Sequence, residues 1–154
     1  MKTFHFSLES LRVLRQQKEQ MAQQRYARAL TACEQAELQF KHSSAELTAG
    51  WNLLNRGLEH GITADRLAQL ETWCKVLKIR RNEGMAALDE ARNAAGRAFR
   101  DMTLAARDRE ALDRFYDKSR QAYVHQAEYE EQKNLDELAV QLSSTPGPLQ
   151  FAGH

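Results

Sequence analysis

The amino-acid sequence predicts an all-α protein, a long two-helix antiparallel coiled-coil hairpin whose second helix extends beyond the first. Three observations predict this fold. The chain of 154 residues is 28% charged, and its two prolines, Pro146 and Pro148, both lie near the C-terminus, which is typical of long exposed helices. Apolar or small residues recur at heptad spacing in both halves. Two glycines, Gly57 and Gly61, interrupt the pattern between the halves.

The first helix is expected at about residues 4–56. A 3-4-3-4 spacing lands almost entirely on apolar or small residues from Ala22 to Leu54, which is the pattern of a coiled-coil seam. These seam positions are Ala22, Tyr26, Ala29, Cys33, Ala36, Phe40, Ser43, Leu47, Gly50 and Leu54. Before them, Phe4, Leu8, Leu11 and Leu14 form a stripe in a slightly different phase. A stutter near Lys18 would join the two stripes.

A turn is expected at about residues 57–63. Gly57 and Gly61 can adopt the left-handed or open conformations that stop a helix. Thr63 can cap the helix that follows, and Asp65 favours the positive end of that helix. With the turn centred near residue 60, Leu11 would lie beside about residue 109. Residues from about 115 to 140 would then project as a single helix.

The second helix is expected at about residues 64–142, so that residues 1–142 form one hairpin and residues 143–154 a disordered tail. The seam of this helix is Leu67, Leu70, Cys74, Leu77, Arg81, Gly84, Leu88, Ala91, Ala95, Ala98, Met102, Ala105, Arg109, Leu112, Tyr116, Ser119 and Tyr123. Leu135, Leu138 and Leu142 form a last stripe in a shifted phase. Many seam residues are alanines, which let helices approach closely but bury little area. We expect a slender monomeric hairpin, although the same seams could join several chains into a larger bundle.

Composition and spacing argue against an enzyme or a metal protein. The formal net charge is +1, which gives no case for nucleic-acid or membrane binding. No histidine has an acidic residue three positions before it, and there is no C-x-x-C, phosphate loop or G-x-S-x-G motif. Cys33 and Cys74 are expected as small core residues. We therefore expect no catalytic residue, no metal, no cofactor and, since the opening has no long apolar run, a cytoplasmic location.

Three stretches resemble the flagellar FliJ family in order, spacing and total length. The opening "FHFSLESLRVLRQQKEQMAQ" has an aromatic residue, then Leu-Glu, then Leu and Arg. "GITADRL" followed by "LETWCKVL" resembles the family's central glycine and the helix after it. "YEEQKNLDELAVQ" resembles the family's Gln-Lys-x-x-Asp-Glu motif near the C-terminus. The resemblance covers about residues 1–142.

The resemblance implies a non-enzymatic stalk of the flagellar type III export apparatus, similar to the γ subunit of rotary ATPases. Such a stalk would sit in the hexameric export ATPase ring, promote its assembly and activity, and link it to the cytoplasmic domain of the membrane export gate. Export chaperones are further implied partners. The protein would be associated with the cytoplasmic face of the inner membrane through these partners.

The resemblance also implies two contact sites. The ATPase contact maps to Arg12 and Arg15 on the first helix and to Gln132, Lys133, Asp136 and Glu137 on the second. The export-gate contact maps to Trp73 and Leu77, which share a helix face. A basic run beside Trp73, "KVLKIRR", departs from the less charged gate face that the family would lead one to expect.

Two other functions stay open from sequence alone. The equivalent stalk of an injectisome type III secretion system would share the fold and the length. A generic coiled-coil scaffold would dimerise through its seams.

Overall fold

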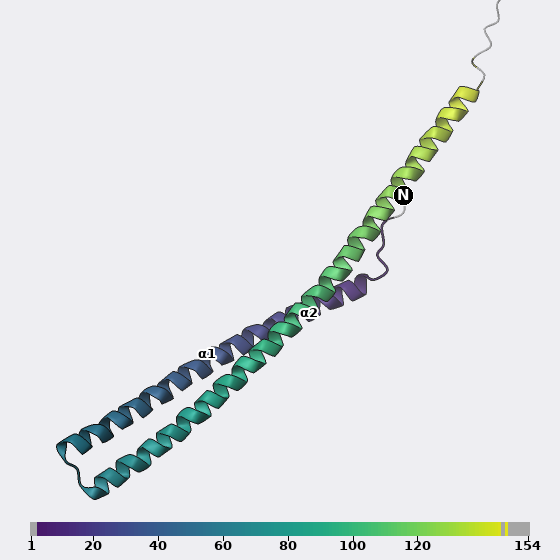
Figure 1. Ribbon diagram of the computed structural model, residues 1–154. Coiled ribbons are helices and arrows are strands. Elements are labelled where there is room, and N and C mark those ends of the chain that lie inside the picture. Colours follow the sequence, from purple (N-terminus) through teal and green to yellow (C-terminus); the bar gives the residue numbers. More distant parts are fainter. Residues whose placement is uncertain (1–2, 146, 148–154) are drawn as a thin grey trace, which may run out of the picture. The chain divides into compact units, whose positions relative to one another are not determined.

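The structure, a computed structural model, describes residues 3–145 and 147. They form two helices, α1 (Glu9–His60) and α2 (Ala64–Ser144), and no strand. Figure 1 shows the two helices joined by a short connection and lying side by side near it. The predicted all-α fold, a hairpin of two long helices, is confirmed.

The two glycines of the predicted turn have different roles. Gly61, with a φ of 85°, directly follows the last residue of α1 and ends the helix in the left-handed conformation. Gly57 is helical. A Cβ atom there would lie 2.8 Å from Cδ1 of Ile62, so the glycine leaves room for Ile62 to pack back over the last turn of the helix. Because Gly57 is helical and the left-handed residue is Gly61, α1 continues to His60 rather than ending near residue 56.

The start of α2 follows the sequence prediction. The Oγ1 atom of Thr63 accepts a hydrogen bond from the amide of Arg66 at 3.3 Å, and the Thr63 carbonyl accepts one from Leu67 at 3.0 Å. Asp65 lies in the first turn. Thr63 is therefore the N-cap that its position indicated.

The outer ends of both helices differ from the sequence prediction. α1 begins at Glu9 rather than near residue 4, because the segment before it forms a turn in which the Glu9 amide donates to the Phe6 carbonyl at 3.2 Å. α2 includes Ser143 and Ser144, whose hydroxyls donate to carbonyls of the preceding turn. Most of the predicted tail, residues 146 and 148–154, lies outside the described residues.

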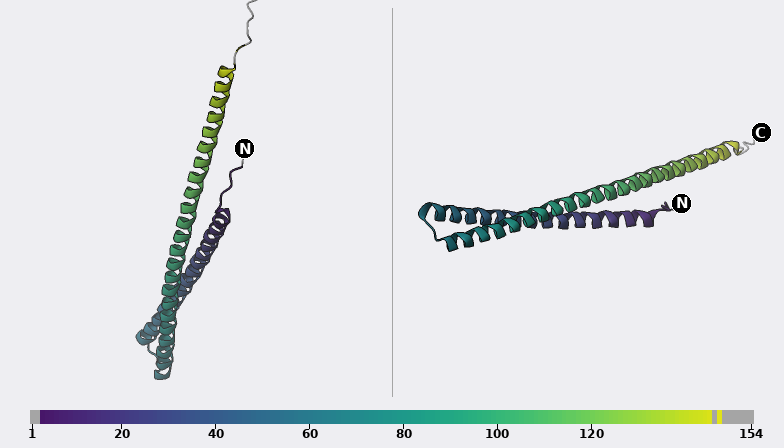
Figure 2. Two further views of the ribbon diagram at one scale, coloured as in Figure 1. Left: turned by 90° about the vertical axis from the view of Figure 1, so that its right-hand side faces the viewer. Right: turned by 60° about the horizontal axis from the view of Figure 1, so that its bottom comes forward.

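Packing divides the chain into two compact units. The hairpin unit is Leu14–Asp108, and the terminal unit combines Met1–Val13 with Arg109–His154. Within the hairpin unit the helices run antiparallel, with Tyr26 beside Phe99 at a ring distance of 5.4 Å. Figure 2 shows the two helices of the hairpin from two further sides.

The predicted seam is the interface of the hairpin unit. Every seam position between Ala22 and Leu54 on α1, and between Leu67 and Ala105 on α2, is buried or half-buried. Leu47 and Leu77 are the most enclosed, at 1% and 2% exposure. The heptad phase also continues towards the start of α1 without the expected stutter. Half-buried Arg15 and Glu19 occupy the inner positions there, and Leu14 is exposed.

Both helices have a glycine in the seam, and the contact at Gly50 is the closer of the two. A Cβ atom on Gly50 of α1 would lie 2.8 Å from Cδ1 of Leu77 and 3.4 Å from Sγ of Cys74. Gly84 of α2 faces Phe40, whose Cα would be 3.6 Å from such an atom. Any larger residue at Gly50 must therefore displace the most enclosed leucine of α2.

The terminal unit has its own small core. Leu112 and Phe6 are its buried side chains, at 5% and 7% exposure. The non-helical segment before α1 lies along α2, where Phe4 contacts the ring of Tyr123 at 5.4 Å. Pairing thus continues past the expected residue 115. From Glu128 to Thr145, in contrast, every residue is exposed.

The close contact at Gly50 generates a stability prediction. Gly50→Leu should lower the free energy of unfolding by about 1–3 kcal/mol, because the new side chain overpacks the seam against Leu77. Gly96→Leu is the matched control, since a Cβ there has nothing within 4 Å, and its gain in helix propensity should stabilise by up to about 1 kcal/mol. Urea denaturation measures both, and equal shifts in the two variants would contradict the proposed packing.

Candidate functional site

A charged cluster ties the start of α1 to α2 in the terminal unit. The Nε atom of Arg12 donates to Asp113 at 3.1 Å, and Nη1 of Arg109 donates to the other carboxylate oxygen at 2.9 Å. The hydrogen bond with Asp113 is the main cause that raises the pKa of Arg12, and Glu9 adds to it. The Arg12 guanidinium also lies 4.1 Å from the ring centre of Tyr116. The Arg12 guanidinium is therefore occupied by contacts with Asp113 and Tyr116 of the same chain.

Aromatic rings extend this cluster along α2. Phe6 packs edge-on against Tyr116 at 5.2 Å and against Phe115 at 5.9 Å. Phe4 contacts Tyr116 at 5.7 Å and Tyr123. We call Phe4, Phe6 and Arg12, with the α2 residues that they contact, the N-terminal clasp. The clasp covers one side of α2 as far as Tyr123, and the segment of α2 that is exposed at every residue begins at Glu128.

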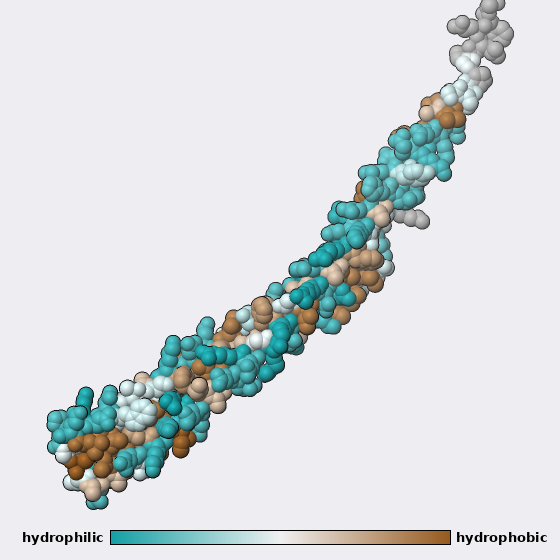
Figure 3. All heavy atoms as spheres, viewed as in Figure 1, coloured by the Kyte–Doolittle hydropathy of each residue, from teal (hydrophilic) through white to brown (hydrophobic). Residues whose placement is uncertain are grey.

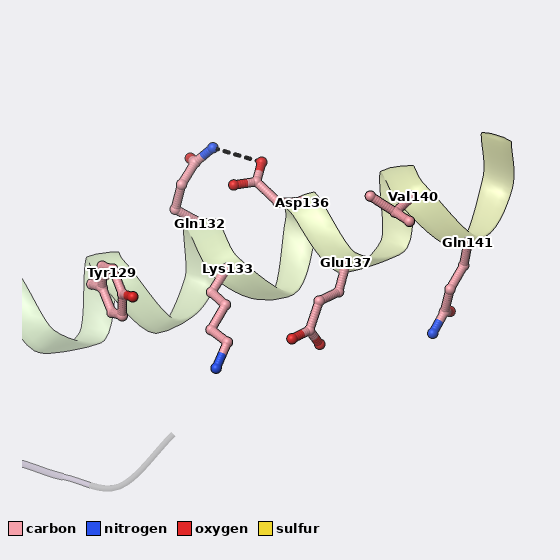
Figure 4. Close-up of a pocket in the computed structure, with 7 residues that line it drawn as sticks. All are labelled: Tyr129, Gln132, Lys133, Asp136, Glu137, Val140 and Gln141. Atoms are coloured by element: carbon pink, nitrogen blue, oxygen red, sulfur yellow. Dashed lines mark hydrogen bonds between the residues drawn. The ribbon is translucent and has the colours of Figure 1, made fainter. Parts of the chain in front are cut away.

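The four α2 residues assigned to the ATPase contact lie on this exposed segment. Figure 4 shows them around a shallow groove together with Tyr129 and Val140. Gln132 donates to Asp136 at 3.2 Å, an i to i+4 bond along the helix. Tyr129 and Val140 are 66% and 65% exposed, so apolar surface accompanies the polar groups. The groove can bind a partner but has no enclosed space for chemistry.

Within the terminal unit, the structure does not bring Arg12 to these residues. Arg12 lies beside Asp113, which is 19 positions before Gln132 and so about 28 Å away along the helix. Arg15 belongs to the hairpin unit, where its Nη1 donates to the Asp108 carbonyl at 2.9 Å. Both arginines pair α1 with α2. The expected register placed Leu11 beside about residue 109. Arg12 instead pairs with Asp113, about one helical turn further along α2 than that register predicts, because α1 continues to His60.

The two residues assigned to the export gate lie at different depths. Trp73 is 44% exposed, whereas Leu77 is 2% exposed and packs beneath Gly50. The groove beside Trp73 is lined by Ala68, Gln69, Thr72 and Val76. Arg80 covers one side of the indole ring, at 5.3 Å from its centre. Trp73 and the short side chains around it can contact a partner, while Leu77 supports the helix from inside.

Apolar surface also gathers at the end of the hairpin where α1 and α2 are joined (Figure 3). Trp51, Leu53 and Leu58 are 43%, 54% and 58% exposed there. Sequence reasoning did not single out these residues, because all three flank the seam rather than occupy it. Tyr129 and Val140 were missed in the same way, although their spacing with Lys133 and Asp136 follows a 4-3-4 pattern.

No group of three or more metal-ligating side chains occurs among the residues that the structure describes. Within the same residues, neither helix has a stretch apolar and long enough to cross a membrane.

Comparison with known proteins places the chain in a family. The family model described as Flagellar FliJ protein matches residues 4–147. No curated protein and no solved structure matches the chain. The matched region includes both helices, the turn, and the exposed segment of α2 with Gln132, Lys133, Asp136 and Glu137. The chain therefore belongs to the flagellar FliJ protein family.

Proposed function

We propose that this protein is the stalk of the flagellar type III export ATPase complex. It inserts into the hexameric ATPase ring, promotes ring assembly and ATP hydrolysis, and links the ring to the cytoplasmic domain of the export gate. Family membership supports a role in flagellar export. The observation that carries the finer proposal is the last part of α2, residues 128–144, which is a single helix exposed on all sides.

A single helix of this kind suits the inside of a ring. Its diameter with side chains is about 10–12 Å, and its residues can reach partner groups in every direction. Gln132, Lys133, Asp136 and Glu137 offer long polar groups for many weak contacts, which a ring can exchange as its subunits change conformation. Tyr129 and Val140 add exposed apolar area beside them.

The turn end of the hairpin unit supports the second contact. Trp73 is a large exposed aromatic residue on a rigid helix, and tryptophan is a favoured anchor in protein interfaces. Trp51, Leu53 and Leu58 add exposed apolar surface at the same end. We place the export gate there, with Trp73 as the anchor and Leu77 as its structural support. Export chaperones are further candidate partners.

Two alternative functions, an injectisome stalk and a generic coiled-coil scaffold, are less well supported. The flagellar family match favours the flagellar system over an injectisome stalk. A generic scaffold that dimerises through its seams is disfavoured, because in the hairpin unit the seam of α1 is already occupied by that of α2.

The first prediction from this function concerns ATPase stimulation. The wild-type chain, titrated into the flagellar export ATPase of the same organism at low enzyme concentration, should raise the hydrolysis rate and the hexamer fraction together. Changing Gln132, Lys133, Asp136 and Glu137 to alanine should raise the half-stimulating concentration about tenfold or more, since several polar contacts are lost at once. The control carries alanines at Gln35, Glu83, Asp89 and Arg100, exposed hairpin residues with the same charge types.

The outcomes separate the possible failures. A wild-type chain that folds but changes neither rate nor assembly would overturn the stalk role. Stimulation that survives the four changes would leave the stalk role standing and remove these residues from the contact.

The second prediction concerns the export gate. Trp73→Ala should weaken binding to the gate's cytoplasmic domain about tenfold or more, with little change in the free energy of unfolding. Ile79→Ala, at an exposed position on another side of α2, should leave binding unchanged. Leu77→Ala should instead cost about 2–5 kcal/mol of stability, because it opens a cavity in the seam. Calorimetric titration and thermal unfolding measure the two effects. Wild-type affinity in Trp73→Ala would place the gate contact elsewhere.

A further inference from the structure

The exposed segment of α2 carries two heptad stripes rather than one. Tyr129, Lys133, Asp136 and Val140 follow one another at a 4-3-4 spacing and share a face, which we call the tyrosine face. The second stripe starts two residues later with the same spacing and consists of Glu131, Leu135, Leu138 and Leu142. We call it the leucine face. A heptad stripe is the pattern of a helix that packs along a partner.

The two faces lie on nearly opposite sides of the helix. At 3.6 residues per turn, a two-residue offset rotates a side chain by about 200° around the axis. Leu135, Leu138 and Leu142 are 55%, 54% and 77% exposed, which is comparable with Tyr129 and Val140. One flat partner surface can therefore cover only one of the faces at a time.

Charge distinguishes the leucine face from the tyrosine face. Residues 124–144 carry five carboxylates and one lysine, a formal excess of four negative charges. The lysine, Lys133, belongs to the tyrosine face. The leucine face has Glu131 in its stripe and Glu128 one heptad before Leu135, and it has no cationic group. A complementary partner thus offers an apolar surface with lysine or arginine at its edge.

A second copy of the chain fits this face less well. In a parallel pair, Glu131 of one copy would lie beside Glu131 of the other, and like charges at neighbouring helix positions are destabilising. The excess of four negative charges on residues 124–144 would oppose association in either direction. The charge pattern therefore favours a different, basic partner.

We propose that the leucine face is a second docking surface for the export ATPase, so that two different subunits of the ring hold the terminal helix between them. One subunit binds the tyrosine face, and another presents an apolar surface with a basic edge to Leu135, Leu138 and Leu142. This inference rests on the proposed function, because the ring is taken as the partner. It adds that stimulation requires both sides of the helix at once.

The test compares full-length variants that remove one face each. Leu135→Gln with Leu138→Gln removes the leucine face, and Tyr129→Gln with Val140→Gln removes the tyrosine face. Glutamine keeps the helix propensity high, and all four positions are more than half exposed, so thermal unfolding should be unchanged. The matched control is Leu38→Gln with Leu104→Gln, two leucines that are 67% and 56% exposed in the hairpin unit.

Each face variant should raise the half-stimulating concentration of the ATPase titration about tenfold, while the control behaves as wild type. Glu128→Gln with Glu131→Gln should weaken stimulation at low salt, and the difference from wild type should shrink at high salt, because screening removes the attraction to a basic surface.

Three outcomes would overturn the inference. If the tyrosine-face variant has a raised half-stimulating concentration but the leucine-face variant stimulates the ATPase as wild type does, the leucine face is not a docking surface. The stalk role is then unaffected. If wild type itself does not bind or stimulate the ATPase, the proposed function and this inference fall together. If light scattering finds a dimer that the leucine-face changes dissociate, the face joins two copies instead.

Discussion

The hairpin unit depends on how closely its two helices approach. Gly50 leaves no side chain in the way of Leu77, and alanines occupy much of the remaining seam. Because the seam buries few large side chains, each close contact contributes a large share of the packing. The heptad phase that these contacts fix determines which residues face the seam and which flank it. It therefore decides that Trp73 is exposed while Leu77, four residues later, is enclosed.

The seam could be predicted because the heptad spacing of its apolar and small residues can be read directly from the sequence. Thr63 could be predicted as an N-cap because capping involves only residues up to three positions away. The role of Gly57 could not be predicted in the same way. A glycine can sit inside a helix or end it, and the choice here depends on Ile62 folding back over the last turn. The heptad pattern also could not predict the N-terminal clasp, since Phe4 and Phe6 contact rings more than a hundred residues away in the chain.

For the candidate sites as well, some features could be predicted from the sequence and others could not. The burial of Leu77 follows from its place in the seam, so its position in the heptad argued against a direct partner contact. The exposure of Gln132, Lys133, Asp136 and Glu137 follows from the absence of any first-helix residue to cover them. The engagement of Arg12 could not be foreseen, because its partner Asp113 is set by the register of the hairpin, which the sequence estimate misplaced by about one turn.

The N-terminal clasp has a practical consequence for how the protein is handled. Phe4 lies against Tyr123, about one and a half turns before the exposed segment of α2 begins at Glu128. An affinity tag or fluorescent protein inserted just before Phe4 would consequently lie next to the surface proposed to enter the ring. Such a fusion would obstruct the proposed insertion by its bulk alone, whereas a label on an exposed residue such as Gln35 would avoid that obstruction.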